Sequence, residues 1–141
     1  MPKKNEADKD AAKLKRKLGA LISKRRGDMS QRQLAKAINI PPSNLKYIED
    51  GVNAPTADVY ARIADILWPD IKSRKKADEL FMAIRKAPPP DVSEAIINNQ
   101  QMIDTIRAMN DLKLNDLQIA AIKELLESFS QENNKGDSNN G

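Results

Sequence analysis

The side chains of this sequence support hydrogen bonding and ionic contacts rather than catalysis. Its 141 residues include no cysteine and no histidine, which excludes disulfides, thiolate metal sites and imidazole acid–base chemistry. No nucleophile paired with a base, no phosphate-binding loop and no cluster of metal ligands can be assembled from the other residues. We therefore expect a protein that is not an enzyme, with no catalytic residue, no metal site and no cofactor.

A set of aliphatic residues between residues 31 and 48 is spaced to hold two short helices at a fixed angle. With Gln31 as the first position, the fourth, eighth, tenth, fifteenth and eighteenth positions are Leu34, Ile38, Ile40, Leu45 and Ile48. The fifth, Ala35, is small enough for a close helix crossing, and the ninth, Asn39, can adopt the left-handed backbone that reverses the chain. This spacing predicts a helix-turn-helix whose second helix is free to enter a DNA major groove. The alternative is an ordinary helical hairpin within a small bundle.

The elements that must position this motif are all predicted to be helices. Apolar periodicity, caps and stops predict them at about residues 10–26, 30–37, 43–49, 55–67 and 74–86. Ser30 and Gln33 have the spacing of a capping box at the start of the second helix. The large apolar side chains expected in the core or an interface are Tyr60, Trp68, Leu80 and Phe81. No segment has the alternation of a strand, so the predicted fold class is all-α.

Three stretches of the sequence resemble a known family. Met29-Ser30-Gln31-Arg32-Gln33-Leu34-Ala35, then Ile40-Pro41-Pro42-Ser43-Asn44-Leu45, then Tyr47-Ile48-Glu49-Asp50-Gly51 with Pro55, are similar to the lambda-repressor-like DNA-binding domain of the Xre, Cro and cI regulators. The similarity to cI is greatest at Gly51-Val52-Asn53-Ala54 and at the lysine-rich N-terminus. It covers about residues 10–85. Asn39 replaces the usual turn glycine, and Pro41-Pro42 stiffens the start of the recognition helix.

The resemblance implies a five-helix domain that binds operator DNA as a dimer, with roles for particular residues. Gln31 matches the glutamine that contacts a phosphate and supports the recognition helix, where the helix N-terminus favours an anion. The positions that face the groove in the family are Ser43, Asn44, Lys46 and Tyr47. Asn44 is suited to adenine and Lys46 to guanine or phosphate, while Tyr47 could pack on a thymine methyl or reach a phosphate.

Three further positions are candidate DNA contacts. Asn53 matches a position just beyond the recognition helix that contacts DNA in the family. Lys3 and Lys4 could wrap the duplex as an N-terminal arm, although a solvated lysine tail explains them equally well. The basic runs Lys24-Arg25-Arg26 and Lys72 to Lys76 either contact DNA or form solvated surface.

Charge and proline content divide the chain into two parts. Residues 1–90 hold 20 Lys and Arg against 11 Asp and Glu, a net charge of +9, whereas residues 91–141 have a net charge of −5. A polyanion partner for the first part and a protein partner for the second would account for this asymmetry, and so would two merely solvated surfaces. We predict a flexible basic arm at 1–9, a DNA-binding domain at 10–87, a proline linker at 88–91, a helical oligomerisation hairpin at 92–131 and a disordered tail at 132–141.

The hairpin is expected to consist of two amphipathic helices, at about 92–110 and 115–131. Asp91 with Glu94 and Asn115 with Gln118 have the spacing of capping boxes at their starts. Two such helices cannot bury their apolar stripes on each other alone, so a partner surface is expected, most simply a second copy of the chain. The residues expected at this interface are Ile103, Ile106, Ile122, Leu125 and Phe129.

Together these features predict a sequence-specific transcriptional regulator. The reading we prefer is a phage, prophage or mobile-element repressor that binds a near-palindromic double-stranded DNA operator as a homodimer or higher oligomer. The alternative is an antitoxin-type adaptor whose hairpin docks a toxin or an antirepressor. A protein-interaction module that does not bind DNA is a third reading. No apolar run approaches the ~18 residues of a membrane span, and we expect a cytoplasmic, nucleoid-associated protein.

Overall fold

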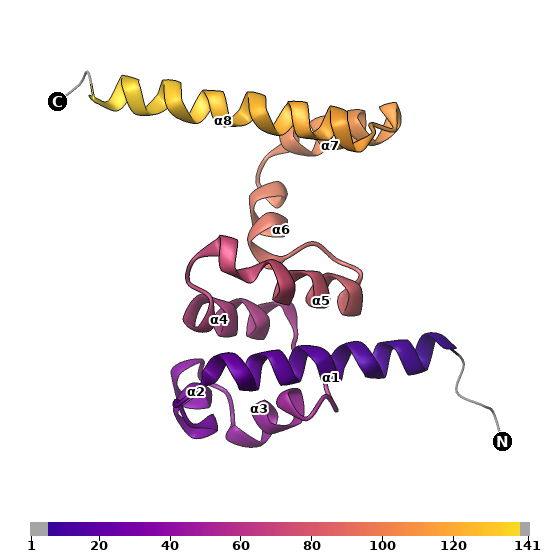
Figure 1. Cartoon of the computed structure of the whole chain (residues 1–141), viewed down its shortest axis with the longest axis vertical. Helices are drawn as coiled ribbons and strands as arrows, with labels where there is room; N and C mark the ends of the chain where they lie inside the picture. Colours follow the sequence, from indigo (N-terminus) through magenta and orange to yellow (C-terminus); the bar gives the residue numbers. More distant parts are fainter. Residues whose placement is uncertain (1–5, 139–141) are drawn as a thin grey trace. The chain divides into compact units, whose positions relative to one another are not determined.

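The computed structural model describes residues 6–138, with the side chains of residues 6–133, and this range contains helices and no strand. The elements are α1 (Glu6–Arg26), α2 (Gln31–Ala37), α3 (Pro42–Glu49), α4 (Ala57–Leu67), the short 3₁₀ helix η1 (Ile71–Arg74), α5 (Lys75–Arg85), α6 (Pro90–Ile97), α7 (Gln100–Leu112) and α8 (Asp116–Ser138) (Figure 1). The predicted all-α class is confirmed. The chain divides into two compact units, residues 1–95 and 96–141, and each is described by itself.

Local signals set the helix ends in the first unit. The Gln33 amide donates to the Ser30 hydroxyl at 3.1 Å, and the Ser30 amide donates to the Gln33 side chain at 2.8 Å, which completes the expected capping box. Gly27, Asn39 and Gly51 all have positive φ angles, of 58°, 58° and 76°. Such angles suit glycine and asparagine, so chain reversals after α1, α2 and α3 occur where the sequence predicted them.

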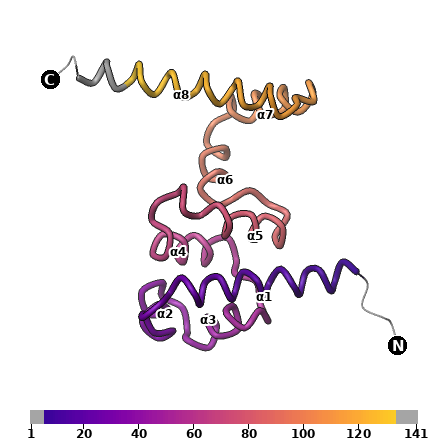
Figure 2. The backbone as a smooth tube through the Cα atoms, in the orientation of Figure 1, coloured from indigo at the N-terminus to yellow at the C-terminus, as the bar shows by residue number. Residues whose placement is uncertain are grey.

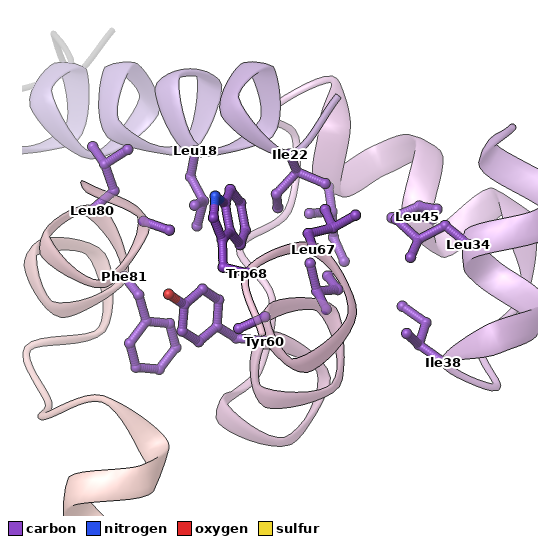
Figure 3. Packing of buried hydrophobic residues seen from close by; sticks show 14 of the residues in the cluster. Leu18, Ile22, Leu34, Ile38, Leu45, Tyr60, Leu67, Trp68, Leu80 and Phe81 are labelled. Atoms are coloured by element: carbon purple, nitrogen blue, oxygen red, sulfur yellow. The ribbon is translucent and has the colours of Figure 1, made fainter. Parts of the chain in front are cut away.

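The core of the first unit lies between α1 and the four helices that follow it. Leu18 and Ile22 point from α1 toward Leu67 and Trp68 (Figure 3), and all four side chains are buried. The rings of Tyr60 and Phe81 stack with their centroids 4.5 Å apart. The four large residues predicted in the core, Tyr60, Trp68, Leu80 and Phe81, are all buried.

Two boundaries in the first unit differ from those predicted. Helix α1 begins at Glu6, so residues 6–9, predicted as part of a flexible arm, are helical. Helix α6 begins at Pro90, because the Pro89 carbonyl accepts hydrogen bonds from the amides of Val92 and Ser93. Asp91 therefore lies in the first turn rather than at the cap position, and the segment between α5 and α6 is residues 86–89 rather than 88–91.

The single helix predicted at 92–110 is wrong, because the chain breaks at residues 98–99 to give α6 and α7. The Asn99 side chain accepts a hydrogen bond from the Met102 amide at 3.1 Å and so caps a new helix. Asparagine competes for backbone groups in this way, while the apolar periodicity continues across the break and hides it. The C-terminal part thus has three helices rather than a two-helix hairpin.

In the second unit, α8 begins as predicted and ends later. The amides of Asn115 and Gln118 are each bonded to the other's side chain, at 3.0 and 2.9 Å. The helix continues to Ser138, whereas the tail from residue 132 was predicted to be disordered. Extending an existing helix costs much less than nucleating one, so a polar segment can continue it without burying apolar surface. Residues 139–141 lie outside the described range.

Candidate nucleic-acid interface

A tight turn joins α2 to α3 (Figure 2), and backbone hydrogen bonds fix its shape. The Ile38 amide donates to the Leu34 carbonyl at 3.0 Å, and the Ile40 amide donates to the Ala35 carbonyl at 3.0 Å. A guanidinium nitrogen of Arg62, from α4, donates to the Ile38 carbonyl at 2.8 Å. Ala35 is completely buried at the crossing of the two helices. The two helices of the motif are therefore held at one angle.

Helix α3 has one side in the core and one side in solvent. Leu45 and Ile48 are buried, while four side chains predicted to face DNA are exposed: Ser43, Asn44, Lys46 and Tyr47. Pro41 caps the helix with its backbone and Pro42 is its first residue. The Lys46 ammonium lies 3.6 Å from the Asp50 carboxylate. Both groups are exposed, so this pair is weak and leaves the lysine able to turn toward another anion.

The other predicted DNA contacts are distributed around α3. Gln31 is the first residue of α2 and is half-buried, and Asn53 is exposed in the segment after α3. Asn44 and Asn53 line one groove of about 200 Å³ together with the apolar side chains of Ile40 and Ile48. Lys3 and Lys4 lie outside the described residues.

Helix α1 supports α3 through a close contact at a glycine. Gly19 is buried in the middle of α1. A Cβ atom placed on it would lie 2.4 Å from the carbonyl oxygens of both Ile48 and Glu49. Carbon and oxygen do not approach so closely, so only glycine lets the backbones of α1 and α3 meet here.

A buried ion pair also joins these two helices. The Arg26 guanidinium donates to the Glu49 carboxylate, with Nη2 at 2.9 Å from Oε1 and Nε at 3.3 Å from both oxygens. The Glu49 side chain is only 3% exposed and that of Arg26 is 16% exposed. Arg26 also donates to the Met29 carbonyl at 2.6 Å. A buried carboxylate needs such a partner, so the pair holds the end of the recognition helix against α1.

The arginines of the basic runs have structural contacts that the sequence did not indicate. The Arg25 Nε donates to the Leu67 carbonyl at 2.8 Å, and the Arg74 Nε donates to the Trp68 carbonyl at 2.6 Å. With Arg26 bound to Glu49, the arginines of both runs connect segments of the fold. The lysines of the runs, Lys24, Lys72, Lys75 and Lys76, are exposed.

Sequence reasoning missed Gly19 and Glu49, although each leaves a local signal. A single glycine inside an amphipathic helix indicates a close approach of another backbone. Glu49 is four residues after Leu45 and next to Ile48, so it falls on the buried side of α3, where a charge requires a partner. Its partner is 23 residues away in the chain, and no local pattern identifies it.

Other kinds of site are not found in the described part of the chain. It holds no group of three or more histidine, cysteine, aspartate or glutamate residues placed to bind a metal ion. None of the helices in residues 6–138 is both long and apolar enough to cross a membrane. The Tyr60 hydroxyl donates to Asp78 at 2.6 Å, and burial together with this carboxylate raises the pKa of the phenol above its ordinary value.

Comparison with known proteins agrees with this geometry. Residues 21–67, from the second half of α1 to the end of α4, match the helix-turn-helix family. Neither the curated proteins nor the solved structures include a significant match to the chain. The family consists of DNA-binding regulators rather than enzymes. The N-terminal part of the chain is therefore a helix-turn-helix domain of the Xre and cI-like type, and this match supports a DNA-binding transcription regulator.

Proposed function

We propose that the protein is a sequence-specific repressor from a phage, prophage or mobile element, which binds a near-palindromic operator as a dimer or higher oligomer. The observation that carries this proposal is the division of α3. Its apolar side is fixed by the core, by Gly19 and by the Arg26–Glu49 pair, while its outer side offers hydroxyl, amide, ammonium and phenol groups. A rigid helix with such a face suits the major groove.

The predicted DNA-binding residues divide into two roles in this proposal. Ser43, Asn44 and Tyr47 read base edges, while Lys46, Gln31 and the lysines at 3 and 4 contact phosphates. Asn53 makes a further contact from the segment after α3. The net charge of +9 over residues 1–90 supports association with a polyanion.

The C-terminal helices supply the oligomer interface in this proposal. Helices α7 and α8 pack little against each other. Leu125 is 55% exposed, Phe129 is 45% exposed and Ile106 is 48% exposed, while Ile103 and Ile122 are half-buried. Apolar side chains left in water on two successive helices favour a protein partner. A second copy would place two recognition helices on one operator.

Selection of duplexes from a random library by the full chain tests DNA recognition. We expect a near-palindromic consensus. The Asn44→Ala variant should relax the preference at one or two base pairs at a cost of ~1–3 kcal/mol, whereas Gln31→Ala should weaken all sites about equally. Glu79→Ala, an exposed change on α5 outside the basic runs, is the control. A preference that survives Asn44→Ala and Tyr47→Ala unchanged would show that this face does not read sequence.

Sedimentation of the full chain tests the oligomer interface. Leu125→Asp should dissociate the oligomer, because it places a charge in the apolar surface. Gln131→Asp adds the same charge on the opposite side of α8, and should leave the oligomer intact. A wild-type chain that is monomeric at micromolar concentration would contradict self-association and favour docking of a toxin or antirepressor on the same surface.

A further inference from the structure

The segment between α3 and α4 forms one wall of the groove beside the recognition helix. Asn44 comes from α3 and Asn53 from this segment, and both line the groove together with Ala54 and Pro55. Asn53 lies in neither helix. Its position relative to Asn44 therefore depends on whatever holds the segment that carries it.

The near end of this segment is held by α3 itself. The amides of Val52 and Asn53 both donate to the Tyr47 carbonyl, at 2.9 and 3.2 Å. Gly51 makes the preceding reversal with a φ of 76°. These bonds fix where the segment leaves α3, but they do not fix the direction of its far end.

One side chain holds the far end. Arg85, the last residue of α5, donates from Nε to the Pro55 carbonyl at 2.9 Å and from Nη2 to the Ala54 carbonyl at 2.9 Å. Two nitrogens of one planar group thus bind two successive carbonyls. The helix that carries Arg85 is anchored in the core by Leu80 and Phe81, so the guanidinium is mounted on a rigid element.

Only arginine can make this contact in this way. Its donors point in fixed directions from a planar group, whereas the ammonium of lysine is a point charge on a flexible chain. Lysine at position 85 would keep the positive charge and lose the paired geometry. This difference separates a geometric role for Arg85 from a purely electrostatic one.

We propose that Arg85 is a positioning residue for DNA recognition, which sets Asn53 opposite Asn44 by binding the carbonyls of Ala54 and Pro55. The inference rests on the proposed DNA contacts of Asn44 and Asn53. Arg85 does not itself contact DNA in this account. Its effect on affinity passes through Asn53, so the two residues should act as one unit.

The test compares full-length variants on the duplex selected by the wild-type chain and on a scrambled duplex. Arg85→Lys should weaken binding to the selected duplex by about tenfold, the size expected for one lost base or positioning contact. Asn53→Ala should cause a similar loss, and the double variant should lose little more than either single variant. Because Arg85→Lys keeps the charge, the slope of log affinity against log salt should not change.

Arg74→Lys is the matched control. Arg74 also donates from Nε to a backbone carbonyl, that of Trp68, and its Nη2 bonds to Asp65. It is part of the same unit and does not line the groove of Asn44 and Asn53. Its lysine variant should lower stability while leaving operator affinity unchanged at temperatures where both proteins are folded. In the free proteins, the amide resonances of Val52 and Asn53 should shift in Arg85→Lys and stay in place in Arg74→Lys.

Different outcomes overturn different parts of the account. If Arg85→Lys binds the selected duplex as the wild type does, or if its loss adds fully to that of Asn53→Ala, the positioning role is wrong. If Arg85→Ala weakens binding and Arg85→Lys restores it, the residue acts by charge alone, which also overturns the proposal. A wild-type chain that selects no sequence would overturn the proposed function together with this inference.

Discussion

Replacing Gly19 by alanine should loosen the support of the recognition helix. The new Cβ would lie 2.4 Å from two carbonyl oxygens of α3. In real structures, a Cβ atom almost never lies closer than 3.0 Å to such an atom. The helices must therefore move apart by about 0.6 Å or more, and the obstacle is backbone that cannot rotate away. Shifts of this kind in a packed core cost ~2–3 kcal/mol.

Helix propensity acts in the opposite direction and is the smaller term. Alanine is favoured over glycine inside a helix by about 1 kcal/mol, so the net loss of stability should be ~1–2 kcal/mol. For a domain of this size that lowers the melting temperature by roughly 4–15 °C. Because the displaced atoms belong to Ile48 and Glu49, affinity for a selected duplex should fall as well.

Thermal and urea unfolding followed by circular dichroism measure the effect. Ala20→Gly, at the exposed neighbouring position of α1, calibrates the propensity term and should destabilise by about 1 kcal/mol. If Gly19→Ala is as stable as the wild type or more stable, then the helix propensity outweighs the contact, and the claim that α1 and α3 are held by their backbones is refuted.

Three other predictions concern charge. Arg26→Ala should destabilise the domain by ~3–5 kcal/mol because it leaves the Glu49 carboxylate buried without its partner. The double variant Arg26→Met with Glu49→Leu should have nearly the stability of the wild type. Equal losses of stability for the two variants in urea unfolding would contradict this explanation. Raising the pH above 10 should cost about 1.4 kcal/mol of stability per pH unit, because the raised pKa of Tyr60 keeps this phenol protonated in the folded state while it ionises in the unfolded state. Tyr60→Phe should make stability depend less on pH in this range. Equal slopes of stability against pH for the variant and the wild type would contradict this prediction. Binding to any duplex should fall ~10³-fold between 50 and 200 mM salt if about six phosphates are contacted, and a log–log slope near zero in a titration would exclude phosphate-dominated binding.

The features that could be predicted from the sequence are those with a local cause. The capping boxes of α2 and α8, the positive φ of Asn39 and the burial of Leu34, Leu45 and Ile48 each depend on residues within one or two turns. Periodicity and spacing report such interactions directly. The helix-turn-helix could therefore be predicted from the sequence, and so could the exposed side of its second helix.

The features that could not be predicted depend on contacts between distant segments. Arg25 reaches a carbonyl 42 residues away, and Arg85 reaches carbonyls 30 and 31 residues away. A side chain that bonds to a backbone carbonyl places no demand on the type of residue that it meets. Such partners leave no trace in composition or periodicity, so these contacts could not be predicted from the sequence.

The break between α6 and α7 was not predicted, for a different reason. Ile96, Ile97, Ile103 and Ile106 continue a helical pattern on both sides of it. The Asn99 cap causes the chain to form two helices instead of one. This cap is a single hydrogen-bonding side chain within an otherwise continuous apolar pattern. Periodicity measures the average over a window and is insensitive to one residue of this kind.

The two prolines at the start of α3 affect the unfolded chain as much as the folded one. Each ring restricts its own φ, and Pro42 also restricts the backbone of Pro41 before it. In the fold Pro41 has a φ of −59° and a ψ of 141°, values that a proline before another proline adopts readily. The unfolded ensemble thus has fewer conformations to lose at this point. Where many binding proteins must order a segment when they meet their ligand, this chain presents a recognition helix whose first turn is set during folding, so that association with DNA has little backbone entropy to overcome there.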